Sequence, residues 1–246
     1  MRAEAATYAA RPDLAARVGE IADPWPEFIH HANCNRLWHV MRERFPQFQL
    51  VLFDADSERM LGRGQTMPVR WDGTAAGLPG GVDDAVEQGA ALADGEADTL
   101  CAIVAVLDPA ARGRRLSSLV IDAMRSAAAT AGLQALIAPV RPTLKEIYPL
   151  TAIESYATWR RDDGRLFDPW LRVHERLGGE VLGIAERSMT VEGKVGEWEI
   201  WTEMPFPETG SYVLPGALVP IEIDCEADLG RYVEPNVWMR HSPRGA

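Results

Sequence analysis

The sequence predicts a mixed α/β (α+β) fold built around one mostly antiparallel sheet that helices flank. An apolar hairpin lies in the first third of the chain, where runs 48–53 and 59–69 enclose the turn residues 54–57. A continuous apolar run at 100–107, rich in β-branched residues, is typical of a buried strand, and a helix connects it to a second such run at 134–140. This strand–helix–strand order favours a parallel pair of strands within the sheet.

Helical periodicity and capping residues indicate the flanking helices. In residues 115–131 the apolar side chains fall on one face, and Gly132 follows the last turn. Residues 169–177 follow Asp168, a good N-cap, and have proline at the first helical position. The other helices that we expect are 13–20, one or two within 26–45, 82–93 in an acidic insertion, and 152–163.

The end of the chain is predicted to form a second hairpin and an extension. Residues 180–190 and 195–204 read as strands on either side of the turn 191–194. Beyond residue 204 the chain is rich in proline and glycine. We therefore expect one domain over 1–204, and an extension, 205–246, that packs on the same domain through short strands.

Composition narrows the classes of function. The chain of 246 residues has a formal net charge of −11, whereas a domain that binds duplex nucleic acid usually has a basic surplus. Its longest apolar run, 100–107, is too short to cross a membrane, and the first thirty residues resemble no signal peptide. The three cysteines are widely spaced, which suits reduced thiols and supplies no metal-ligand pair. We expect a cytoplasmic protein with no nucleic-acid partner, membrane contact or metal.

A loop that follows the buried strand has the properties of a phosphate site. The first amides of a helix lack internal partners, and the helix dipole adds positive charge there. Three arginines near the start of the predicted helix place positive charge at the positive end of its dipole, which is unfavourable. Binding of an anion there would explain these arginines better than incidental placement does. The segment that we expect to bind it comprises Val104, Val106, Leu107, Arg112, Gly113, Arg114, Arg115, Leu116, Ser117 and Ser118.

This loop resembles the pyrophosphate loop of the GNAT superfamily of acyltransferases. The family pattern is Gln or Arg, two residues, Gly, one residue, then Gly or Ala. Arg112 matches the first position, whereas Arg115 replaces the central glycine and Ser117 the last small residue. Residues 174–181 are similar to the family's signature at the end of its fourth helix, and the order of elements over residues 10–204 also fits.

The resemblance implies an N-acyltransferase with a pantetheine thioester as donor and a small-molecule amine as acceptor, possible acceptors including natural-product intermediates. In the family the pantetheine arm lies where two parallel strands splay apart, here 100–107 and 134–140. A backbone N–H near Val106 would polarise the thioester carbonyl, and the amine would attack directly. No cofactor would be bound permanently.

The roles of single residues follow from their matching positions. His174 stands where the family often has a tyrosine that acts as general acid, and a packing role competes with this one. Glu199 and Glu203 are candidate bases beside Trp201, a candidate substrate contact, although a solvent-facing strand explains the same pattern. Arg141 could bind an acidic group of the substrate.

Several alternatives stay open. The donor is an acyl-CoA, or an acyl group on the phosphopantetheine of an acidic carrier protein that docks on Arg112, Arg114 and Arg115. A covalent mechanism through Cys34, and a non-catalytic binding protein, are the competing classes. Residues 205–246 would cover the acceptor side, and a monomer and a homodimer are both consistent with the sequence.

Overall fold

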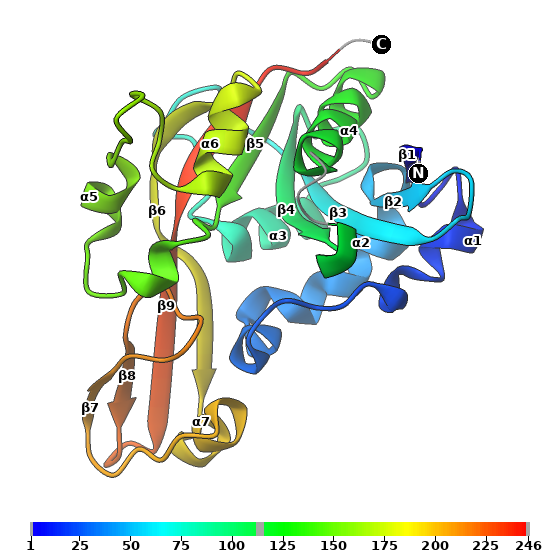
Figure 1. Cartoon of the computed structure of the whole chain (residues 1–246). Helices are drawn as coiled ribbons and strands as arrows, with labels where there is room; N and C mark the ends of the chain where they lie inside the picture. Colours follow the sequence, from blue (N-terminus) through cyan, green and yellow to red (C-terminus); the bar gives the residue numbers. More distant parts are fainter. Residues whose placement is uncertain (1, 112–115, 245–246) are drawn as a thin grey trace.

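The computed structural model describes residues 2–111 and 116–244, which form a nine-stranded sheet with helices on both faces (Figure 1). The spatial order is β1-β2-β3-β4-β5-β9-β8-β7, and β6 pairs with β9. All neighbouring strands are antiparallel except β4 and β5. The strands are β1 (Ala3–Thr7), β2 (Leu50–Asp54), β3 (Met60–Val69), β4 (Thr99–Leu107), β5 (Ala135–Val140), β6 (Glu180–Gly193), β7 (Gly210–Tyr212), β8 (Ile221–Asp224) and β9 (Leu229–His241).

The helices follow the predicted positions in most places. Helix α6 begins at an N-cap, Asp168, whose side chain accepts hydrogen bonds from the amides of Trp170 and Leu171, as its sequence predicts. The predicted helix 152–163 is wrong beyond residue 157, because the chain there turns into an isolated bridge between Arg160 and Leu166. The α-helices are α1 (Pro12–Ala15), α2 (Trp38–Arg44), α3 (Val82–Ala91), α4 (Leu116–Thr130), α5 (Ile153–Ala157), α6 (Pro169–Arg176) and α7 (Val195–Thr202), and the 3-10 turns are η1 (Val18–Glu20), η2 (Glu27–His31), η3 (Asn33–Leu37), η4 (Pro46–Phe48), η5 (Pro109–Ala111) and η6 (Lys145–Ile147).

Helices α3 and α4 cover opposite faces of the sheet. A Cβ atom on Gly64 would lie 2.7 Å from Met124 of α4, so this helix packs directly on the β3 backbone. A Cβ atom on Gly89 of α3 would lie 2.2 Å from Met67 of β3. Since residues 64 and 67 of a strand point to opposite faces, the two helices enclose the sheet between them.

The predicted parallel pair is confirmed, and the two strands splay apart. Strands β4 and β5 pair only from Thr99 to Cys101 and from Ala135 to Ile137. Beyond these residues β4 continues to Leu107 and β5 to Val140 without a shared ladder. The sheet therefore contains a wedge that widens toward the carboxyl ends of both strands.

The predicted strand 195–204 is wrong, because residues 195–202 form helix α7. The carboxylate of Glu197 accepts a hydrogen bond of 2.7 Å from the Lys194 amide, which caps the first turn of the helix. Trp198 and Trp201 are three residues apart and pack against each other, with ring centroids 5.1 Å apart. The alternation of tryptophan and glutamate in this segment is thus compatible with a helix as well as with the strand that we predicted.

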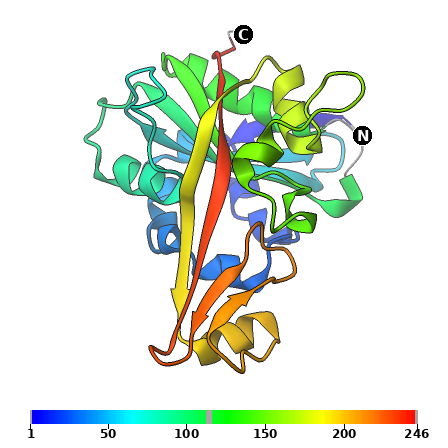
Figure 2. The same ribbon diagram turned by 90° about the vertical axis from the view of Figure 1, so that its left-hand side faces the viewer.

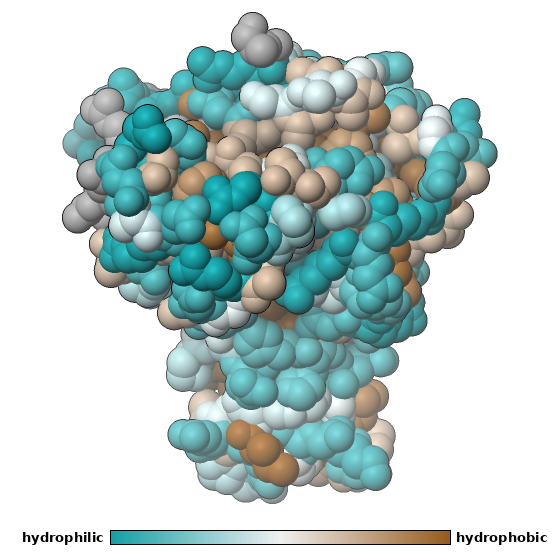
Figure 3. Space-filling model, turned by 90° about the vertical axis from the view of Figure 1, so that its right-hand side faces the viewer, coloured by the Kyte–Doolittle hydropathy of each residue, from teal (hydrophilic) through white to brown (hydrophobic). Residues whose placement is uncertain are grey.

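Strands β7, β8 and β9 of the C-terminal segment belong to the same sheet. Strand β9 pairs with β6 over most of its length, and with β5 and β8 along its other edge. The lower parts of β6 and β9, with β7, β8 and helix α7, extend as a narrow arm below the main body (Figures 1 and 2). The surface of this arm is mostly hydrophilic, with a small apolar patch near its end (Figure 3). The extension that we predicted is therefore an integral part of the fold.

Candidate active site

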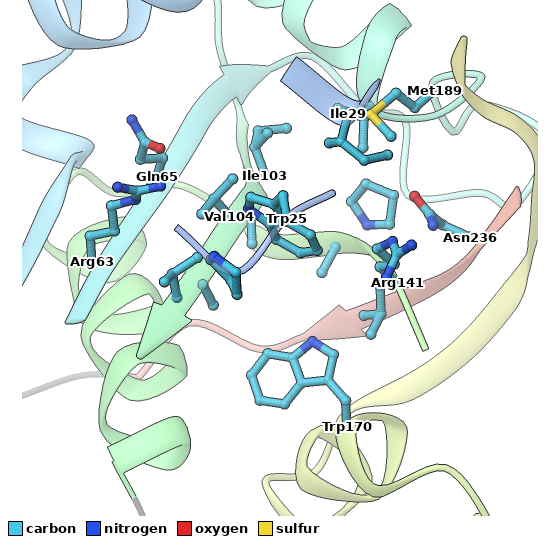
Figure 4. A pocket seen from close by; sticks show the side chains of 18 of the residues that line it. Trp25, Ile29, Arg63, Gln65, Ile103, Val104, Arg141, Trp170, Met189 and Asn236 are labelled. Atoms are coloured by element: carbon cyan, nitrogen blue, oxygen red, sulfur yellow. The ribbon is translucent and has the colours of Figure 1, made fainter. Parts of the chain in front are cut away.

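A cavity of about 1240 Å³ occupies the wedge between β4 and β5. Residues 102–107 of β4 form one wall, and Ala138, Pro139 and Val140 of β5 form part of the other. The wall of β4 is largely aliphatic, as Ile103 and Val104 illustrate in Figure 4. Such a surface suits a slender, weakly polar ligand arm that lies along the strand.

The cavity connects the two faces of the sheet. On the α4 face it is lined by Ser117 and Met124 of α4 and by Trp170 and His174 of α6. On the opposite face it is lined by residues from the N-terminal segment, α3, β6 and the loop before β8. These are Asp23, Pro24, Trp25, Pro26, Ile29, His30, Cys34, Asn35, Val82, Met189, Pro215 and Gly216. Two ligands can therefore approach the middle of the wedge from opposite faces.

The predicted phosphate loop is described only in part. Arg112, Gly113, Arg114 and Arg115 lie outside the described residues. Val104, Val106, Leu107 and Ser117 line the cavity, whereas Leu116 is buried in the hydrophobic core and Ser118 is not among the lining residues. Helix α4 begins beside the carboxyl end of β4, which places its N-terminal turn next to the wedge.

The ladder between β3 and β4 contains an irregularity beside the cavity. Gln65 pairs with Val104 and Thr66 with Ala102, which leaves Ile103 as an extra residue on β4. A bulge of this kind turns the local backbone away from regular pairing. It therefore lies where backbone groups of β4 can be directed into the wedge.

His174 is buried on α6 and pairs with a histidine that the sequence analysis did not single out for catalysis. Its Nδ1 lies 2.9 Å from Nε2 of His241, the last residue of β9. Burial, and then the proximity of His241, lower the pKa of His174 to about 3. Burial likewise lowers the pKa of His241 to about 4. Both rings are therefore neutral at pH 7.

The other nitrogen of His174 is available for chemistry. Nε2 is buried and has no hydrogen-bond partner among the described residues. His174 also lines the cavity, and the Trp170 ring packs against it with centroids 4.6 Å apart. A buried polar atom without a partner is costly, and such atoms are typical of functional sites.

Arg141 lies at the carboxyl end of β5 and lines the same cavity. Its Nε donates to both oxygens of Glu234, each 3.0 Å away, and its guanidinium stacks over the Trp25 ring at 5.4 Å. Burial lowers the pKa of Arg141, but the charge and hydrogen bond of Glu234, together with nearby Tyr232 and Glu146, outweigh burial and raise this pKa above its ordinary value. Arg141 is thus a fixed cation in the wall of the cavity.

The two candidate bases lie away from the cavity. Glu199, Trp201 and Glu203 belong to α7 or the residue after it, and none of them lines the cavity. The Glu199 carboxylate accepts a hydrogen bond of 3.1 Å from the Phe206 amide, and the Trp201 ring stacks on His31 at 4.0 Å. These contacts give Glu199 and Trp201 structural roles, and Glu203 follows the last residue of α7.

Cys34 has the wrong properties for a nucleophile. Burial, and then the nearby Asp83 carboxylate, raise the pKa of its thiol. A nucleophilic cysteine needs the opposite shift, toward thiolate. No hydrogen bond between Cys34 and His30 occurs in the described part of the chain.

Sequence reasoning missed Trp25 and Glu234, and it gave His241 no role in catalysis. Only His241 carried a signal, as one of five histidines. Glu234 is 1% exposed and meets Arg141 across 93 positions of sequence, which local patterns do not reveal.

The splayed sheet, and the cavity that crosses it beside a buried histidine, define an acyltransferase of the GNAT type. The chain is 31% identical over 267 residues to the arginine N-acetyltransferase avaD of Aspergillus versicolor, covering 96% of this chain and 92% of that protein. The chain therefore belongs to the GNAT superfamily of N-acetyltransferases. No protein-family model matches it.

Two solved structures share the fold over nearly the whole chain. The loading GNATL domain of CurA from Lyngbya majuscula is 13% identical, with a TM-score of 0.57 and coverage of 98% of both chains. The GphF GNAT-like decarboxylase, solved in complex with isobutyryl-CoA, is 20% identical, with a TM-score of 0.58 and coverage of 99% and 100%. At these identities the likeness concerns the fold.

Two features are absent from residues 2–111 and 116–244. No helix there is long and apolar enough to cross a membrane. No group of three or more His, Cys, Asp or Glu side chains there could hold a metal ion.

Proposed function

We propose that this enzyme transfers an acyl group from an acyl-CoA to the amine of a small molecule, by direct attack within the wedge. The observation that carries the proposal is the cavity that joins the two faces of the sheet between β4 and β5. The pantetheine arm would enter from the α4 face, where Ser117 in the first turn of α4 lines the cavity. The acceptor would enter from the face that carries Trp25 and Met189.

Positioning two substrates accounts for much of the rate in such a mechanism. The amine nitrogen attacks the thioester carbon, the C–S bond breaks, and the thiolate departs. A backbone N–H of β4 near the bulge at Ile103, or near Val106, would donate to the carbonyl oxygen as it gains charge.

His174 would carry the proton from the amine to the sulfur. Because its imidazole is neutral at pH 7, it suits the role of acceptor better than that of a standing acid. In the tautomer whose Nδ1–H donates to His241, Nε2 is free to accept the proton that the attacking amine loses. The same nitrogen then releases the proton to the departing thiolate, so the ring ends as it began.

The donor is proposed to be acetyl-CoA, since the relative avaD is named an acetyltransferase, and arginine is the first acceptor to test for the same reason. A carrier-bound donor is the second candidate. It is favoured by Arg115, which replaces the loop glycine that cradles the CoA pyrophosphate in the family. A role in secondary metabolism would suit either donor.

The test is a steady-state assay of thiol release from acetyl-CoA, with arginine and other small amines as acceptors and mass spectrometry of the product. We expect acceptor-dependent release of CoA and an acetylated amine. Acetyl-pantetheine without the nucleotide serves as the matched donor. Equal kcat/KM for both donors would favour the carrier, and no transfer from either donor to any amine would contradict the proposed function.

A further inference from the structure

Arg141 is held by a buried polar cluster at the edge of the cavity. Glu234, whose carboxylate pairs with Arg141, also accepts hydrogen bonds from the Tyr232 hydroxyl at 2.7 Å and from the Asn236 amide at 3.2 Å. Burial, and then the Glu234 charge, raise the pKa of Tyr232 well above its usual value, so this hydroxyl keeps its proton. The carboxylate is therefore fully engaged in fixing the guanidinium.

The guanidinium itself is only partly engaged. An arginine has five N–H donors, and here Nε is used by Glu234 and one hydrogen of Nη2 by the Gly216 carbonyl. Nη1 has no hydrogen-bond partner in residues 2–111 and 116–244. It also does not belong to the fully buried side-chain atoms that lack a partner in these residues. Two or more donors of a rigid, planar fork are thus unpaired among these residues, on a side chain that lines the cavity and is 16% exposed.

These donors lie on the acceptor side of the wedge. Arg141 contacts Trp25 of the N-terminal segment and Gly216 of the loop before β8, and neither belongs to the α4 face. Figure 4 shows Arg141 beside Asn236, with Trp170 of α6 on the other side of the cavity. A ligand group bound by Arg141 would belong to the acceptor rather than to the pantetheine arm.

We propose that Arg141 binds a carboxylate of the acceptor, so that the substrate class is amino acids with a free α-carboxylate. A guanidinium has no acceptor atom, so its partner must offer lone pairs. A carboxylate offers two oxygens in the geometry of the fork, and its charge makes each hydrogen bond stronger than a neutral one. This proposal rests on the proposed acyl transfer and specifies what the acceptor carries.

The experiment compares amino acids with their carboxamides, with arginine and argininamide first. Calorimetric titration of the CoA-bound protein measures binding without turnover, and the thiol-release assay measures KM and kcat. We expect the free acid to bind at least about 10-fold more tightly than the amide, the range for loss of a hydrogen bond to a charged group. Amides that bind as tightly as the acids would overturn the proposal even where acyl transfer is active.

Variants separate recognition from stability. In Arg141→Lys, one ammonium cannot both hold Glu234 and present a fork, so the preference for the acid should fall to about 2-fold or less. Arg44→Lys is the matched control, because Arg44 also bonds a carboxylate and backbone carbonyls but does not line the cavity. It should keep the full preference.

A double variant covers the case in which Arg141→Lys does not fold. Arg141→Gln with Glu234→Gln replaces the ion pair by neutral groups of similar size, which leaves no buried charge unpaired. This variant should also lose the preference while its acetyl-CoA binding is retained. Retained preference in a folded variant would contradict the role of Arg141. If no amine is acylated at all, the proposed function fails, and the calorimetric comparison still decides whether Arg141 recognises a carboxylate.

Discussion

The buried histidine pair makes the stability of this protein depend on pH in a calculable way. An unfolded histidine binds a proton near pH 6.5, whereas His174 and His241 in the fold do so only near 3 and 4. Between these values the unfolded chain binds more protons than the folded one, so stability falls as the pH falls below about 6.5. Above that pH both states are neutral at these rings and the effect vanishes.

The magnitude follows from the size of the shifts. One pKa unit corresponds to about 1.4 kcal/mol, and pH 5 lies about 1.5 units below the pKa of an unfolded histidine. Each ring therefore lowers the free energy of unfolding by about 2 kcal/mol at pH 5 relative to pH 7.5. The pair therefore costs about 4 kcal/mol, a large fraction of the stability of a typical domain. Urea unfolding at pH 7.5, 6.5, 5.5 and 5.0 measures it for the wild type and for the double variant His174→Gln with His241→Gln.

We expect the wild type to lose about 4 kcal/mol more than the double variant over this range, since contributions of the carboxylates cancel in the comparison. His39→Gln, at an exposed histidine, should behave as the wild type. A difference below about 1 kcal/mol between wild type and double variant would refute the reasoning, because the two rings would then titrate in the fold as they do in water.

Four further substitutions test the assignment of the site. Gly179→Ala would place a Cβ atom 2.7 Å from the His241 ring, so we expect a loss of about 1–3 kcal/mol in urea unfolding and a lower kcat. Cys34→Ala should keep kcat/KM within about 2-fold of wild type, because a thiol of raised pKa is not the nucleophile; complete loss of turnover in a folded variant would restore the covalent mechanism. Glu199→Gln and Glu203→Gln should likewise leave the pH profile of kcat unchanged, since both residues lie outside the cavity, and loss of its basic limb would show that the arm reaches the active site.

Local sequence patterns were sufficient to predict those elements whose structure depends on neighbouring residues alone. The continuous apolar run of β4 and the Asp168-Pro169 start of α6 each depend on neighbouring residues, and both were found. The family resemblance then supplied His174 and the wedge, which no periodicity alone reveals.

Where structure depends on distant partners, the sequence was ambiguous or silent. The alternating segment after residue 194 fits a strand and a helix equally well. In the structure the long strand β9 pairs with β6, at the position where we expected this segment, and the segment forms helix α7. The Arg141–Glu234 pair and the histidine pair each join residues more than sixty positions apart. Only the tertiary fold brings such groups together.

A crystal structure with acetyl-CoA and a non-reactive acceptor analogue tests the central claim most directly. The account predicts the thioester in the wedge between β4 and β5, its carbonyl oxygen against a backbone N–H of β4, and its sulfur within hydrogen-bond reach of His174 Nε2. A donor bound elsewhere, or a thioester whose sulfur lies far from His174 with the acceptor entering from the α4 face, would contradict it.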